Sequence, residues 1–114
     1  LKEAVKAVDW QMHLSEGLSR PVLLESVGKQ RIKRIAWCTG AAQDGIHQAA
    51  AQGVEAYITG EASERTIHEA RELGVHLFVA GHHATERYGV QALGAHCASH
   101  FDISHQFIDI DNPI

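Results

Sequence analysis

The 114-residue chain is long enough for one domain with a hydrophobic core and too short for two. Apolar residues make up 45% and charged residues 21%, as in ordinary globular proteins, and the formal charge of −4 argues against nucleic acid as a partner. No apolar run approaches the length of a membrane span, no signal peptide opens the chain, and Cys38 and Cys97 form no CxxC pair. We therefore expect a cytoplasmic protein with free thiols and no membrane partner.

The first residues have helical periodicity, with apolar side chains at Leu1, Ala4, Val5, Val8 and Met12. This spacing predicts an amphipathic helix that starts at the first residue and is closed by Gly17 and Pro21. This helical periodicity begins at the first residue, which is not an initiator methionine. We therefore expect residues 1–114 to be a single α/β domain that forms the carboxyl-terminal part of a longer, two-part protein. The apolar run Val22–Leu24 predicts a short strand.

A pattern of strand, glycine and helix then repeats three times. Short apolar runs end at Gly40, Gly60 and Gly81, which are 20 and 21 residues apart, and a helix-length segment follows each glycine. This alternation predicts an α/β fold with a mostly parallel or mixed sheet flanked by helices. The alternating segment His105–Ile110 predicts a final strand.

The three helices have recognisable faces and ends. The first has an apolar side that includes Ile46 and Ala49. We expect the second to be capped by Ser63, to end at Gly74, and to point inward with three residues: Ile67, Ala70 and Leu73. The third is expected over about 84–98.

Polar residues follow the carboxyl ends of the three repeated strands. In open sheets of this kind, ligands bind beyond those ends. If the strands are parallel neighbours, three loops converge at one edge: Thr39-Gly40, Thr59-Gly60-Glu61 and Gly81-His82-His83. A site is therefore expected there.

His82 and Glu86 are four residues apart, which places an imidazole and a carboxylate on one helical face. Both are ligands for divalent transition metals. Glu86 also lies on the apolar line of Val90, Leu93 and Cys97, so we expect it to need a partner. The alternative to a metal is that Glu86 caps the helix and pairs with a nearby base.

Glu61 and His83 lie beside this pair in the sequence, and each has two interpretations. Glu61 could line the same edge, or it could be an acidic residue in the first turn of a helix, which the sequence slightly favours. His83 could assist the site or be an ordinary hydrogen-bonded turn residue, and we favour the latter. No nucleophile elbow, P-loop or dinucleotide fingerprint is visible.

Four segments together resemble one known family. They are Arg34–Gly40 (RIAWCTG), Tyr57–Glu64 (YITGEASE), Ala80–Arg87 (AGHHATER) and Phe107–Ile110 (FIDI). In order and spacing they are similar to the carboxyl-terminal half of the NIF-three-like family, whose bacterial members are named GTP cyclohydrolase 1 type 2 homologues. Members are about twice as long as this chain, and the resemblance covers nearly all of it.

The resemblance implies an α/β fold, a homohexameric ring and a site for two divalent metal ions, with zinc, iron or manganese as candidates. It assigns His82 and Glu86 as metal ligands. The other ligands, a His-His pair and an Asp, belong to the amino-terminal half and are absent here. We therefore expect this chain alone to have a vacant or partly occupied site.

Two functions are consistent with these observations. The first is a metal-dependent hydrolase of the two-metal type, in which a bridging water attacks a nucleotide-like or phosphoester small molecule. GTP as the substrate follows only from the family's name. The alternative is a metal-binding, ring-forming structural or interaction protein that catalyses no reaction.

Overall fold

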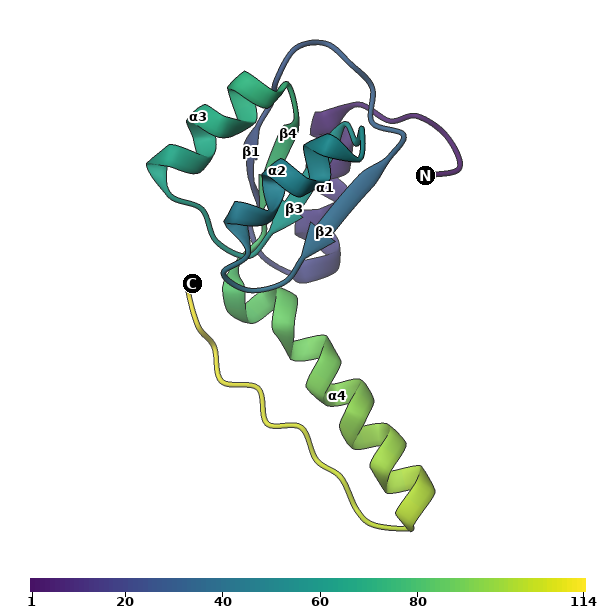
Figure 1. Ribbon diagram of the computed structural model, residues 1–114. Coiled ribbons are helices and arrows are strands. Elements are labelled where there is room, and N and C mark those ends of the chain that lie inside the picture. Colours follow the sequence, from purple (N-terminus) through teal and green to yellow (C-terminus); the bar gives the residue numbers. More distant parts are fainter.

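The computed structural model describes residues 1–114 and has a four-stranded sheet at its centre, in the order β1-β4-β3-β2 (Figure 1). The strands β2 (Ile35–Cys38), β3 (Ala56–Thr59) and β4 (His76–Val79) are parallel, and β1 (Leu23–Glu25) pairs antiparallel with β4. The α/β class with a mixed, mostly parallel sheet is confirmed. The three glycine-closed apolar runs are the three parallel strands.

Helices cover both faces of this sheet, as parallel strands require. Figure 1 shows α1 on one face and α2 and α3 on the other. Neighbouring strand residues point to opposite faces: Phe78 packs with Ala7 of α1, whereas Leu77 packs with Ile46 of α2 and Ala70 of α3. These elements are α1 (Ala7–Leu18), the 3-10 turn η1 (Gln43–Gly45), α2 (Ile46–Ala51) and α3 (Glu64–Leu73).

The first helix differs from its prediction. Val5 is extended and exchanges two backbone hydrogen bonds with Ile32, at 3.0 and 2.8 Å, so α1 cannot begin before it. The helix also continues through Gly17 and ends at Leu18, and its C-cap Ser19 is left-handed (φ 56°). The predicted apolar stripe is wrong: Val8 and Met12 are exposed. The side that meets the sheet has the same spacing in another phase, with Ala7, Trp10, Leu14 and Leu18.

The helix predicted between Ser63 and Gly74 is largely confirmed as α3. Ser63 is its N-cap in a reciprocal capping box with Thr66, and Gly74 closes it in a left-handed conformation (φ 69°). Ala70 is buried and Ile67 packs against the same cluster, as expected. Leu73, however, is exposed.

The helix α4 (His82–Phe101) begins two residues earlier than expected and extends away from the sheet (Figure 1). Only Ala84, in its first turn, is buried. The predicted inward line through Val90 and Leu93 is therefore wrong within this chain, where both side chains are exposed. The apolar spacing is present, but no helix or strand of this chain packs on these two side chains.

The predicted strand His105–Ile110 is also wrong. Residues 103–114 contain neither helix nor strand and run back along α4 toward the sheet (Figure 1). Ile108 and Ile110 are exposed. The segment lies beside a helix, whose backbone groups are already paired, so it finds no strand with which to form a ladder.

No helix combines the length and the apolar character that crossing a membrane requires.

Candidate metal centre

The three glycine turns meet at one edge of the sheet, as the repeated pattern predicts. The amides of Gly60 and Glu61 donate to the carbonyl of Gly40 at 3.0 and 3.2 Å, and the amide of Gly81 donates to the carbonyl of Gly60 at 2.9 Å. Because β2, β3 and β4 are parallel neighbours, their carboxyl ends bring these turns into register. The edge is thus held by backbone hydrogen bonds that do not depend on any ligand.

His82 and Glu86 face each other at this edge. His82 is the first residue of α4, and its Nε2 lies 2.9 Å from Oε2 of Glu86. Gly40 makes room for the pair: a Cβ there would overlap Oε1 of Glu86 and lie 3.1 Å from Nε2 of His82. Gly40 is also left-handed (φ 69°), so its conformation and its closeness to the pair both favour glycine.

The other ring nitrogen of His82 is occupied by Glu61. Nδ1 of His82 lies 2.5 Å from Oε1 of Glu61, a short charge-assisted hydrogen bond. Of the two interpretations of Glu61, the edge position is right and the helix-turn position is wrong, because α3 begins only at Glu64. Residues 61 and 82 each directly follow a strand-closing glycine, and that shared position is the signal from which their contact could have been predicted.

The electrostatics of the edge favour a cation. Hydrogen bonding to the Glu61 carboxylate is the largest influence and raises the pKa of His82 above its ordinary value. Desolvation opposes it, and the charge of Glu86 adds a further increase. Two carboxylates therefore surround one imidazole, and no lysine or arginine pairs with either of them.

The donor set fits half of a metal site. Ligands of one divalent ion, each about 2.0–2.2 Å from it, lie about 2.8–3.6 Å apart, from octahedral to tetrahedral angles. The 2.9 Å between Nε2 of His82 and Oε2 of Glu86 lies at the short end of that range, whereas the 2.5 Å between Nδ1 and Glu61 is too short. No group of three or more histidine, cysteine, aspartate or glutamate residues is arranged to hold a metal ion. The chemistry and the glycine cradle fit a metal, and the number of ligands falls short.

An open cavity of about 310 Å³ borders the pair on its Nε2 side. It is lined by His82, His83, Glu86, Asn112 and Ile114. The end of the chain thus returns to the candidate site, and the amide of His83 donates to the carbonyl of Ile114 at 3.2 Å. His83 itself bonds through Nε2 to Asp109 at 2.8 Å, and Arg87 binds the same carboxylate at 3.1 Å.

The remaining histidines with defined partners are used elsewhere. His76 is buried in β4, where its Nδ1 accepts from the amide of Val27 at 3.0 Å and its Nε2 lies 3.1 Å from the carbonyl of Gln30. His47 pairs with Glu69 at 3.2 Å on the surface formed by α2 and α3. None of them joins the edge that holds His82.

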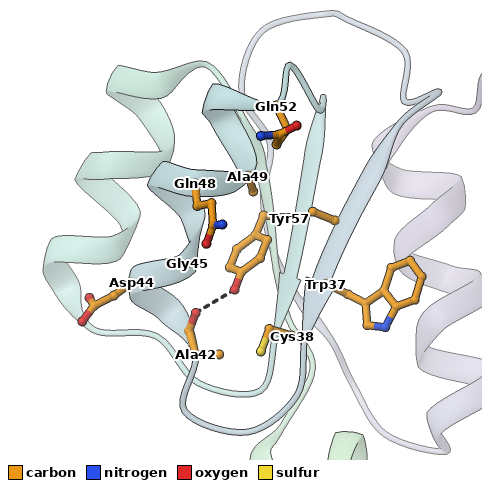
Figure 2. A pocket seen from close by; sticks show the side chains of 10 residues that line it. Trp37, Cys38, Ala42, Asp44, Gly45, Gln48, Ala49, Gln52 and Tyr57 are labelled. Atoms are coloured by element: carbon orange, nitrogen blue, oxygen red, sulfur yellow. Dashed lines mark hydrogen bonds between the residues drawn. The ribbon is translucent and has the colours of Figure 1, made fainter.

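A second cavity, of about 380 Å³, lies between β2 and α2 (Figure 2). Tyr57 lines it and donates its hydroxyl to the carbonyl of Ala42 at 2.7 Å, and burial raises the pKa of Tyr57. Cys38 and Asp44 also line it, but no histidine does. No motif in the sequence points to this cavity, and its lining does not form an acid–base or metal-ligand set.

The chain is similar in sequence to longer proteins that share one name. A GTP cyclohydrolase 1 type 2 homolog of Pseudomonas aeruginosa is 55% identical over 113 residues, which are 99% of this chain and 44% of that protein. A protein of the same name from Allochromatium vinosum is 50% identical over the same shares. The chain thus spans less than half the length of these relatives.

Solved structures show the same fold. The protein ybgI, described as of unknown function, superposes with a TM-score of 0.95 at 44% identity, over all of this chain and 47% of its own. A Bacillus cereus protein related to NIF3 superposes with a TM-score of 0.82 at 22% identity, over all of this chain and 33% of its own. The family model for Duf34/NIF3 (NGG1p interacting factor 3) matches residues 1–113. The chain belongs to the Duf34/NIF3 family.

Proposed function

We propose that the full-length protein containing this chain binds two divalent metal ions and uses them as a hydrolase on a nucleotide-like or phosphoester small molecule. The observation that carries this proposal is the pair His82 and Glu86, with donor atoms 2.9 Å apart in a glycine cradle at the ligand-binding edge of the sheet. The name shared by the relatives, GTP cyclohydrolase 1 type 2 homolog, supports the chemical class.

In this proposal His82 and Glu86 act as ligands and not as the general base. Bound divalent ions supply Lewis acidity and an activated water at neutral pH. Structural and catalytic metal sites use three or four protein ligands, so the missing ones come from the part of the protein outside this chain. The cavity beside the pair gives a substrate access from the Nε2 side, with the side chains of His83 and Asn112 at its wall.

A specific observation also favours assembly, whether or not the protein is an enzyme. Val90, Leu93 and Phe101 of α4 are exposed along a helix that no other element of this chain covers. The second candidate is therefore a metal-binding, ring-forming protein that catalyses no reaction, with the homohexamer of the family as its form. A cytoplasmic location is part of both proposals.

The test is metal content and turnover of the full-length protein. We expect the purified, metal-restored protein to hydrolyse GTP or generic phosphoesters, and Glu86→Ala to lower bound metal in elemental analysis without unfolding the protein. Glu64→Ala is a matched control, because Glu64 near the start of α3 likewise has a histidine four residues away, His68, at 4.0 Å. Unchanged metal in Glu86→Ala would make the ligand assignment wrong. Metal binding without turnover would favour the second candidate.

A further inference from the structure

The backbone of Glu61 holds this residue at the sheet edge where the three glycine turns meet. Its amide donates to the carbonyl of Gly40 at 3.2 Å, next to the amide of Gly60, which donates to the same oxygen at 3.0 Å. Its carboxylate oxygen Oε1 lies 2.5 Å from Nδ1 of His82. A glutamate side chain is flexible, but here its starting point is fixed by the turn that also places Gly40 beside Glu86.

Glu61 and Glu86 lie on different sides of the His82 ring. The two nitrogens of an imidazole point in divergent directions, so a group bonded to Nδ1 cannot share a ligand site with Nε2. The cavity of about 310 Å³ is lined by His82 and Glu86 and not by Glu61. This cavity therefore borders the His82–Glu86 pair, whereas Glu61 lines a different cavity of about 360 Å³ that His82 does not line.

From this arrangement we infer that Glu61 is a positioning residue, which accepts the Nδ1 hydrogen of His82 and so directs the Nε2 lone pair toward the metal. The inference rests on the proposed metal site. A neutral imidazole carries its hydrogen on one nitrogen, and the partner of that hydrogen decides which nitrogen is free to bind a metal. The carboxylate also fixes the ring's rotation. Loss of such a partner typically weakens metal binding by about 10–100-fold.

Three variants of the full-length protein test the inference: Glu61→Ala, Glu61→Gln and Glu64→Ala. We expect Glu61→Ala to weaken the affinity for Zn²⁺, measured by competition with a chelator, by about 10–100-fold, with an unchanged number of ions bound at saturation. Glu61→Gln keeps an oxygen that can accept the Nδ1 hydrogen, so it should retain most of the affinity. Glu64→Ala should not change it.

A spectroscopic measurement separates positioning from general stability. In the zinc-loaded wild type we expect nitrogen-15 NMR to show His82 with hydrogen on Nδ1 and metal on Nε2, protected from exchange. Glu61→Gln should keep this signal, whereas in Glu61→Ala the Nδ1 hydrogen of His82 should exchange rapidly with solvent. Thermal unfolding checks that each variant is folded. If Glu61→Ala does not fold, the test is made with Glu61→Gln alone.

The outcomes are distinguishable. Affinity and NMR signal that remain at wild-type values in both Glu61 variants would overturn the inference while leaving the metal site intact. A reduced number of ions at saturation would overturn it too, because Glu61 would then be a ligand. A wild-type protein that binds no Zn²⁺, or a Glu86→Ala variant that binds it fully, would overturn the proposed site itself.

Discussion

The sheet and the long helix α4 bury their apolar residues to very different extents. Phe78 of β4 is fully buried, whereas Leu93 of α4 is 62% exposed. Both residues lie on a regular apolar pattern, but only the first has elements of this chain on every side. His82 and Glu86 lie where the two regions join, on the first turns of α4. The candidate site therefore takes its position from the buried sheet, while the helix that carries it leaves most of its apolar residues exposed.

The largest expected effect is in the sheet. Phe78→Ala should lower the free energy of unfolding of this chain by about 3–5 kcal/mol, because it leaves a cavity in a closed core. Leu93→Ala should change it by less than about 0.5 kcal/mol, since the side chain is already exposed. Urea unfolding measures both. A comparable loss in Leu93→Ala would mean that α4 is covered in solution, for example by another copy of the chain.

The second effect is at the junction. Gly40→Ala should lower the stability by about 1–2 kcal/mol through its left-handed backbone, and should also displace Glu86 and weaken metal binding in the full-length protein. Gly74→Ala is the matched control, because Gly74 has the same φ of 69° and no atom within 4 Å of an added Cβ. The control should lose similar stability and keep its metal. Equal metal content in both variants would mean that the glycine cradle plays no part in the site.

The smallest effect is expected from breaking a surface ion pair between α3 and β1. Nε of Arg71 donates to Glu25 at 2.8 Å and Nη2 donates to the same carboxylate at 3.2 Å, and this hydrogen bonding lowers the pKa of Glu25. A carboxyl group with a lowered pKa in the folded state adds stability above its unfolded pKa of 4.5 and loses it as the pH falls through the folded value.

The urea midpoint of Arg71→Gln should therefore lie slightly below that of the wild type at pH 7, and the two should converge as the pH falls below 4.5 and through the lowered pKa of Glu25. Arg65→Gln, which removes another exposed pairing on α3, provides the comparison at the same pH values. A difference between Arg71→Gln and the wild type that persists unchanged into acid would show that Arg71 acts through packing and not through charge.

Much of the site could be predicted from the sequence because it depends on local features. The glycines that close three apolar runs mark where the three strands end. The spacing of His82 and Glu86 places both side chains on one face once a helix forms. The contact between Glu61 and His82 depends in addition on the strand order, since it requires β3 and β4 to be parallel neighbours in register. Sequence spacing alone left both positions for Glu61 open.

The sequence by itself determined the α/β class, the parallel strands, the caps of α3 and the pair His82–Glu86, because each follows from short-range periodicity, turn chemistry or helical spacing. Only the tertiary structure decided which phase of the apolar pattern in α1 is buried, that residues 103–114 form no strand, and that Val90 and Leu93 are exposed. The physical reason is the same in each case. A periodic pattern shows that a segment has an apolar face, but burial requires a partner surface, and that surface comes from elsewhere in the fold.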